Sequence, residues 1–424
     1  MKSWITPFPV ALPVHEDNLY LFDTAAQQKQ RVTVEDHHAT MYVCGITPYD
    51  ATHLGHANTY VAFDLLYRYW IAAGYRVTYT QNVTDVDDPL FERANELDID
   101  YRELGQEQTD LFRSDMQHLN VLAPSHYLGV SETVDWIRTL VRDMVTAGVA
   151  YEVPGDETHP DGDIYFSIEA AEKQTPWRLG SIGAHTTDEM LEYFPERGGD
   201  PNRAGKRNPL DPLIWSARRE GEPYWSDEVL GEGRPGWHVE CSAIAHHTLP
   251  APFTVQGGGS DLRFPHHEFS AAHATSVTGQ PMAQHMVHSG MVGLNGVKMS
   301  KSLGNLELVS NLVARGKSPV AIRTLLLDNH YRSDWSYTED ALTATTTRLE
   351  AWKSALAFEQ AGDADALSAE IFAALSDDLD APNALRAVDR WAERVHAAAT
   401  PRDTSLAAIN VAVILDALLG IKLY

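Results

Sequence analysis

The order of elements between residues 41 and 82 most constrains the fold of this chain. Residues 41–45 (MYVCG) form a short apolar strand candidate that ends in glycine, and residues 76–82 (RVTYTQN) form a second strand candidate. Between them, the apolar positions of residues 56–73 recur at helical spacing, and Gly74 is a natural helix end. A strand, a helix and a second strand in this order predict the βαβ unit of a parallel sheet. The sequence therefore predicts an α/β fold.

The rest of the chain divides into regions of different character. Residues 1–38 are expected to form an extended, proline-containing N-terminal arm. The predicted catalytic domain spans residues 39–120 and 236–304, because a second α/β stretch begins near residue 236. Residues 121–235 contain a hairpin candidate and a stretch rich in glycine, proline and charge, so we interpret them as an inserted domain. Residues 305–424 show only helical periodicity and are predicted to be a C-terminal helical region.

Charge and composition limit the classes of function. The 424 residues include 59 acidic and 33 basic side chains, which gives a formal net charge of −26. This charge argues against a broad grip on phosphate backbones but leaves room for a local basic pocket. No run approaches the roughly 20 apolar residues of a membrane span, and prolines interrupt the apolar N-terminus. We therefore expect a cytoplasmic protein without membrane contact, and two cysteines exclude a disulfide scaffold.

The first motif with chemical meaning is His53-Leu54-Gly55-His56, at the start of the predicted helix. A helix N-terminus offers unpaired N–H groups and a positive dipole end, which suit a phosphate chain. Gly55 allows a nucleotide to approach the backbone, and both imidazoles can donate to phosphate oxygens. A four-residue pattern alone is a weak indication of function.

The second motif is Lys298-Met299-Ser300-Lys301-Ser302, within a glycine-rich stretch. Lysines on such a loop can close over a polyphosphate and neutralise the charge of a departing pyrophosphate. An exposed basic loop is the simpler interpretation of this motif taken alone. The two motifs together, in this order, are much more specific than either.

A third group of residues has the chemistry of a metal site. Cys44, Cys241 and His266 each lie at a predicted strand end or in a first helical turn, where a doubly wound sheet gathers its ligand site. Two thiolates and an imidazole would suit zinc with an open fourth position. Two buried free cysteines would explain the same sequence, and spacing does not separate the two readings.

Six colinear segments together resemble cysteinyl-tRNA synthetase over roughly residues 40–340: MYVCGITPYDATHLGHANTYVAFDLLYRYW, QNVTDVDD, GRPGWHVECSAI, GGGSDLRFPHHE, HSGMVGLNGVKMSKSLGN and HYRSDWSYTED. The resemblance implies a class I synthetase fold: a Rossmann-like catalytic domain with an inserted connective domain and a C-terminal helical domain. HLGH and KMSKS would be its two signature motifs. It also implies that Cys44, Cys241 and His266 bind zinc, which would take the thiolate of substrate cysteine and exclude serine.

Three departures from the synthetases point to a different member of this group. Synthetases carry a glutamate as fourth zinc ligand four residues after the histidine, where this chain has Ser270. The C-terminal region is short for anticodon binding, and residues 196–201 (ERGGDP) resemble the mycothiol-pathway cysteine ligases. That family implies ATP-dependent ligation of L-cysteine to the amine of glucosaminyl-inositol through a cysteinyl-adenylate, with AMP and pyrophosphate as products. The ERGGDP segment would help to close a small polar pocket beside the adenylate.

The alternatives are a true cysteinyl-tRNA synthetase and a catalytically inactive binding module. A basic strip on the insertion or on the C-terminal helices would favour the synthetase, but the basic residues there are scattered. Intact HLGH and KMSKS motifs and three metal ligands argue against the inactive module.

The resemblance assigns roles to individual residues. The catalytic residues would be His53, His56, Lys298 and Lys301. The residues lining the adenylate would be Cys44, Gly45, Ile46, Thr47, Thr59, Asn82, Val83, Thr84, Trp237, Gly259, Ser260, Asp261 and Val292. Asp261 would bind either a ribose hydroxyl or the substrate ammonium. We expect one zinc ion per chain, held by three protein ligands, with magnesium arriving on ATP. The expected partners are ATP, cysteine and glucosaminyl-inositol, without tRNA, for a monomeric enzyme.

Overall fold

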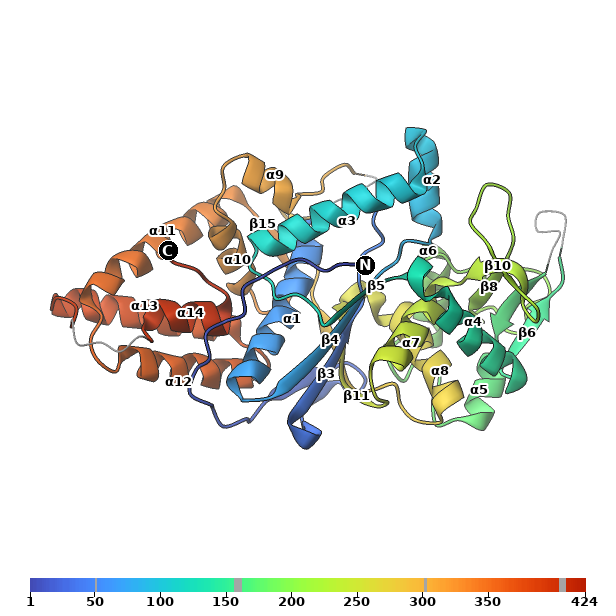
Figure 1. Ribbon diagram of the computed structural model, residues 1–424, viewed down its shortest axis with the longest axis horizontal. Helices are drawn as coiled ribbons and strands as arrows, with labels where there is room; N and C mark the ends of the chain where they lie inside the picture. The colour runs from blue at the N-terminus through green and yellow to red at the C-terminus, as the bar shows by residue number, and fades with distance from the viewer. Residues whose placement is uncertain (50–51, 156–161, 301–302, 404–408) are drawn as a thin grey trace.

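A computed structural model describes residues 1–49, 52–155, 162–300, 303–403 and 409–424. It contains a central parallel sheet, with an inserted domain on one side and a group of helices on the other (Figure 1). No helix in these described ranges is both long and apolar enough to cross a membrane.

The central sheet has the strand order β12-β11-β3-β4-β5, and all its neighbouring strands are parallel. The strands are β3 (His38–Val43), β4 (Arg76–Val83), β5 (His126–Gly129), β11 (Phe253–Gly259) and β12 (Ala283–Ser289). In chain order this is the doubly wound arrangement 3-2-1-4-5, whose strand order reverses between β3 and β11. Near-continuous burial along β3 and β11 is typical of strands covered on both faces. The predicted parallel α/β sheet is confirmed.

Helix α1 (Leu54–Ala72) lies between this sheet and the C-terminal helices, and it is buried around most of its circumference. It begins two residues before the predicted start, because His53 caps it. Its buried Asp64 accepts hydrogen bonds from Arg68 Nε (2.7 Å) and from Arg323 Nη2. Burial alone would raise the pKa of Asp64, but the two guanidinium groups outweigh it and hold that pKa below its ordinary value. The same arginines donate to backbone carbonyls near the chain's C-terminus, including Leu419 O at 2.7 Å, so the C-terminal helices are tied to α1.

The inserted domain contains an antiparallel sheet of order β6-β7-β8-β10-β9 and lies on the right in Figure 1. The predicted hairpin is present as β6 (Ala150–Val153) paired with β7 (Asp163–Phe166). The other elements of this part are α4 (Val130–Thr146), α5 (Ile168–Gln174), α6 (Thr187–Glu196), β8 (Leu213–Ala217), β9 (Trp225–Asp227) and β10 (Gly231–Pro235). Strand β5 lies within residues 121–235, the range expected for the insertion, yet it pairs with β4 in the central sheet.

Two helices after the insertion belong to the second half of the central α/β unit, namely α7 (Trp237–Thr248) and α8 (His266–Thr278). They pack against each other and, with α4, form a second apolar core on the side of the insertion. In chain order, α2 (Asp88–Leu97) and α3 (Tyr101–His118) come between β4 and β5, the last two strands at one end of the sheet.

The C-terminal region is mainly helical, as predicted. Its helices are α9 (Val309–Ala314), α10 (Pro319–Leu327), α11 (Glu339–Ala355), α12 (Asp363–Ser376), α13 (Ala381–Ala398) and α14 (Val411–Leu419). It also contains a strand that the periodicity does not predict, β15 (Trp335–Tyr337), which pairs with β13 (Val292–Leu294). Strand β13 also pairs with β14 (Val297–Lys298). In the N-terminal arm, the chain forms a short hairpin of β1 (Tyr20–Asp23) and β2 (Gln28–Arg31) where only extended chain was expected. Three short 3-10 helices complete the described elements: Glu35–His37, Ser260–Arg263 and Leu356–Phe358.

Candidate active site

A cavity of about 510 Å³ lies at the carboxyl ends of β3 and β11, where the strand order of the central sheet reverses. Open α/β sheets bind ligands at this position. Its wall includes residues of the HLGH motif, residues of the KMSKS motif, and Cys44. Cys44, Cys241 and His266 are called the Cys44 group below. The fold therefore brings the three predicted chemical groups to one place.

The HLGH motif forms the N-terminus of α1. The backbone N–H of Gly55 donates to His53 Nδ1 at 3.0 Å, which leaves the proton of a neutral His53 on Nε2. The His53 and His56 rings stack with centroids 3.9 Å apart. Burial lowers the pKa of His56 to about 4, and burial together with repulsion from His56 lowers the pKa of His53 to about 2. Both rings are thus neutral N–H donors at neutral pH in the free protein.

The described part of the KMSKS motif follows a tight hairpin. Asn295 and Gly296 have positive φ angles of 49° and 82°, the pattern of a type I′ turn between β13 and β14. This turn presents Lys298 in the cavity wall. Leu54 N donates to Glu307 O at 3.0 Å, so the chain after this motif runs beside the HLGH motif. Lys301 and Ser302 lie outside the described residues.

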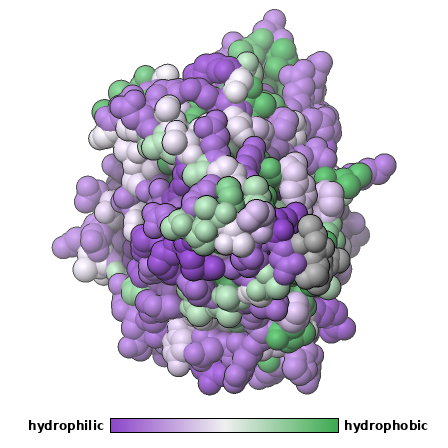
Figure 2. Space-filling model, turned by 90° about the vertical axis from the view of Figure 1, so that its left-hand side faces the viewer, coloured by the Kyte–Doolittle hydropathy of each residue, from purple (hydrophilic) through white to green (hydrophobic). Residues whose placement is uncertain are grey.

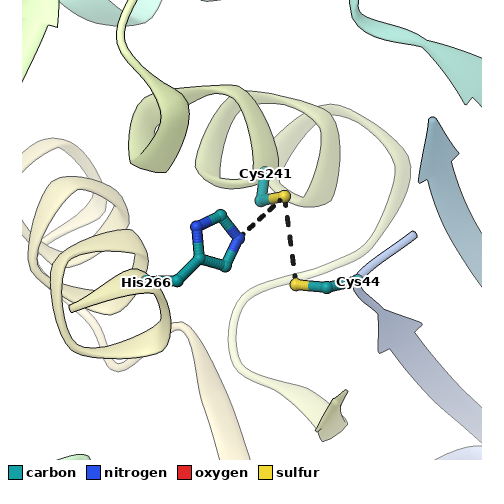
Figure 3. A group of neighbouring side chains, drawn as sticks. All are labelled: Cys44, Cys241 and His266. Atoms are coloured by element: carbon teal, nitrogen blue, oxygen red, sulfur yellow. Dashed lines mark hydrogen bonds between the residues drawn. The ribbon is translucent and has the colours of Figure 1, made fainter. Parts of the chain in front are cut away.

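The third group consists of Cys44 after β3, Cys241 on α7 and His266 on α8 (Figure 3). The two sulfur atoms are 3.9 Å apart, and His266 Nε2 lies 3.2 Å from Cys241 Sγ. All three side chains are buried, and their ligand atoms lie within 4.8 Å of one another, so they could hold a metal ion.

The surroundings shift the pKa values of the two thiols in opposite directions. Burial opposes ionisation of Cys241, but hydrogen bonding with Cys44 and the nearby His266 outweigh it and hold the pKa of Cys241 below its ordinary value. Burial and the neighbouring Cys241 raise the pKa of Cys44. One thiolate is therefore favoured over two in the free protein, and a bound cation would stabilise a second one.

Ser270 stands where the resemblance places a glutamate in synthetases, and its side chain bonds to the backbone of α7. Its hydroxyl donates to His238 O at 3.0 Å, and Ser242 Oγ donates to Ser270 O at 2.9 Å. The Ser270 hydroxyl is thus used to join α8 to α7. Within the described ranges, the candidate metal group consists of three residues.

Several residues that the sequence did not single out surround the Cys44 group. Tyr60 OH donates to Cys44 O at 3.1 Å, and His267 Nε2 lies 3.2 Å from Cys44 Sγ. Gln256 Nε2 lies 3.5 Å from the same sulfur. Tyr60 follows His56 by one helical turn, and this spacing is the sequence feature that could have placed Tyr60 near the site.

The residues expected at the adenylate divide into two sets. Eight of them line the cavity: Cys44, Gly45, Ile46, Thr47, Thr59, Trp237, Gly259 and Asp261. Trp237 also stacks on His266, with ring centroids 4.4 Å apart. The remaining five are not among the residues that line it: Asn82, Val83, Thr84, Ser260 and Val292. Asn82 supports the wall directly, because its Oδ1 accepts from Gly45 N at 2.8 Å.

The ERGGDP segment reaches the same cavity from the inserted domain. Glu196 and Arg197 are part of the cavity wall. Arg197 Nη1 donates to Asp261 O at 2.7 Å and to Phe264 O, both in the loop that follows β11. The insertion is thus joined to the catalytic domain at the site itself.

Comparison with known proteins agrees with this geometry. Residues 30–347 match the family model described as "tRNA synthetases class I (C) catalytic domain". A Micrococcus luteus protein named L-cysteine:1D-myo-inositol 2-amino-2-deoxy-alpha-D-glucopyranoside ligase is 57% identical, and the match covers 100% of both chains. A Paenarthrobacter aurescens protein of the same name is 52% identical, again over 100% of both chains.

Solved structures of synthetases share the fold. Mycobacterium tuberculosis methionyl-tRNA synthetase in complex with methionyl-adenylate matches with a TM-score of 0.61 at 16% identity, covering 85% of this chain and 82% of that one. The ternary complex of Agrobacterium radiobacter K84 LeuRS with tRNA and LeuAMS matches with a TM-score of 0.58 at 12% identity, covering 92% and 83%. At these identities the likeness concerns the fold alone. On the family model and the full-length relatives, the chain belongs to the class I (C) synthetase catalytic-domain family and, within it, to the L-cysteine:1D-myo-inositol 2-amino-2-deoxy-alpha-D-glucopyranoside ligases.

Proposed function

We propose that this chain joins L-cysteine to the amine of 1D-myo-inositol 2-amino-2-deoxy-alpha-D-glucopyranoside, or glucosaminyl-inositol, in mycothiol biosynthesis. ATP would be converted to AMP and pyrophosphate through a cysteinyl-adenylate. The observation that carries the proposal is a single cavity lined by Cys44, the HLGH histidines and Lys298, with Cys241 and His266 next to Cys44. A thiol-binding group beside two phosphate-binding motifs is what activation of cysteine requires.

Cys44, Cys241 and His266 fit zinc by their chemistry and spacing. Two thiolates about 2.3 Å from a tetrahedral zinc ion would be about 3.8 Å apart, and the two sulfur atoms here are 3.9 Å apart. When bound, zinc would supply a soft ligand position for the thiolate of substrate cysteine, which a serine hydroxyl fills poorly. Trp237 packs against the His266 ring and keeps this side of the cavity apolar.

In the first step, the carboxylate of cysteine attacks the α-phosphorus of ATP, and the bond to pyrophosphate breaks. Magnesium would arrive on the phosphates of ATP. The N–H groups of His53 and His56 donate to phosphate oxygens, and the Lys298 ammonium neutralises charge on the departing pyrophosphate. The expected role of Lys301 is the same.

In the second step, the acceptor amine attacks the carbonyl carbon of the adenylate. The new C–N bond forms as the C–O bond to AMP breaks, and the nitrogen loses a proton to solvent. Holding both reactants in one cavity supplies much of the acceleration, because the mixed anhydride is already reactive.

The C-terminal helices support the small acceptor over tRNA. Four arginines of the C-terminal region form ion pairs with carboxylates of this chain: Arg348 with Asp328 and Asp389, Arg390 with Glu370, Arg394 with Asp363, and Arg402 with Glu359. Figure 2 shows this end of the molecule, where hydrophilic residues cover most of the face. Because local carboxylates neutralise these charges and the whole chain carries −26, a long polyanion gains little here.

The test is a comparison of acceptors. The protein is incubated with ATP, cysteine and either glucosaminyl-inositol or tRNA at low salt, where tRNA binding is strongest. Formation of the cysteinyl amide of the sugar, without charged tRNA, is the expected result. Efficient cysteinylation of tRNA without the sugar product would overturn the proposal in favour of a synthetase. The cytoplasmic location and the monomeric state stay predictions.

A further inference from the structure

The ERGGDP segment is held on both sides of its first residue. After it, Arg197 contacts two carbonyls of the loop that carries Asp261, and its guanidinium lies 4.7 Å from the centre of the Tyr193 ring. Before it, Phe194 is buried against Phe264, with ring centroids 6.2 Å apart. Glu196 is therefore fixed at the cavity wall by neighbours on both sides.

Gly198, Gly199 and Asp200 fix the conformation of the turn that follows Glu196. Gly198 has φ +85°, which strains any other residue, and a Cβ atom on Gly199 would lie 2.5 Å from the Phe194 ring and displace it. Asp200 accepts a hydrogen bond from Lys206 Nζ at 2.8 Å and another from Tyr165 OH. The turn after Glu196 is thus anchored to the inserted domain.

No step of the proposed reaction described above uses the Glu196 side chain. It is exposed, it is part of the cavity wall, and among the described residues its carboxylate forms neither a hydrogen bond nor an ion pair. The nearest guanidinium along the chain, that of Arg197, is engaged with the carbonyls of Asp261 and Phe264. A carboxylate in a substrate cavity, on a rigid turn and without a protein partner, is available to a ligand.

We infer that the Glu196 carboxylate binds the amine of the amino-sugar acceptor; this inference rests on the proposed function. A carboxylate accepts several hydrogen bonds and attracts an ammonium group, which matches an acceptor that is cationic when it arrives. The phosphates of ATP already have His53, His56 and Lys298, so Glu196 would repel rather than help them. The same negative charge disfavours a polyanion at this part of the wall, which makes Glu196 a determinant of acceptor class.

The experiment separates the two half-reactions in the full-length, zinc-loaded enzyme. Glu196→Gln keeps the side-chain size and removes the charge. Cysteine-dependent ATP–pyrophosphate exchange, which reports the first step, should stay within about twofold of the wild type. The KM for glucosaminyl-inositol should rise about tenfold to a hundredfold, the worth of one charge-assisted hydrogen bond.

The matched control is Glu192→Gln, an exposed carboxylate one turn earlier on α6 that does not line the cavity. It should leave both half-reactions unchanged. An acceptor KM equal to that of the wild type in Glu196→Gln would overturn the inference while the proposed function stands. A rise in the KM for ATP during exchange would also overturn it, because Glu196 would then serve the nucleotide. A wild-type enzyme that makes no sugar amide would overturn the proposed function as well.

Discussion

His273 makes the folded protein sensitive to mild acid. It lies on α8 with a fully buried side chain, its ring meets the edge of Phe166 at a centroid distance of 4.7 Å, and neither ring nitrogen has a hydrogen-bond partner within the described ranges. Burial, with repulsion from His266, lowers its pKa to about 3. The unfolded chain therefore takes up a proton near pH 6.5, whereas the folded chain does so only near pH 3.

The sign and size of the effect follow from these two values. Above pH 7.5 both states are neutral, and His273 costs less than about 0.1 kcal/mol. At pH 5.5 the unfolded state is mostly protonated and the folded state is not, so the free energy of unfolding falls by about 1.4 kcal/mol. The loss grows as the pH falls further and is complete near pH 3.

The assay is urea unfolding of the wild type and of His273→Gln at pH 7.5 and pH 5.5. The substitution keeps a polar, similarly sized side chain that does not titrate, so the drop in stability between the two pH values should be smaller by about 1.4 kcal/mol in the variant. The control is His246→Gln, an exposed histidine on the neighbouring helix α7, which is solvated in both states and should leave the drop as it is in the wild type. An equal drop in His273→Gln and the wild type would refute the reasoning, because it would mean that the buried ring is protonated as easily as the unfolded one.

Three further substitutions test the site and its support. In Gly45→Ala, the new Cβ would lie 1.6 Å from Asn82 O, so the chain beside Cys44 must move, and cysteine-dependent exchange should fall at least about tenfold; exchange near the wild-type rate would contradict the close packing. Cys241→Ala should lose both the bound zinc, measured by metal analysis, and the exchange activity, whereas one retained zinc per chain would speak against the ligand set. Asp64→Asn leaves two buried guanidinium groups without their carboxylate and should cost about 3–5 kcal/mol in urea unfolding; a cost below about 1 kcal/mol would show that the ion pairs are dispensable.

The sequence predicts the elements whose pattern is long or strongly buried. The β3–α1–β4 unit is confirmed, because its apolar positions have the period of the structure that they form. Strands β5 and β15 were missed because they contain only four and three residues, too few to show an alternation. Their place in a sheet depends on backbone hydrogen bonds to strands that are distant in sequence, which side-chain patterns do not record.

The site was predictable in its parts more than in its arrangement. The HLGH and KMSKS motifs are local, so their residues could be named from the sequence. Asn82 was expected in the wall, yet it is not among the residues that line the cavity and its amide holds Gly45, because the turn after β3 passes over the end of β4. Glu196 could be found as part of a motif, but only the turn geometry of the folded chain shows that it faces the cavity.

The Cys44 group is assembled from segments that are synthesised far apart in time. Cys44 and Cys241 are 197 residues apart, and the whole inserted domain is translated between them. A nascent chain that ends inside the insertion carries one thiol of the pair and lacks His266, so it cannot build the three-residue ligand set. A metal ion held by all three residues would therefore be captured only after α7 and the start of α8 have been translated, and a shorter chain would not bind zinc through this site.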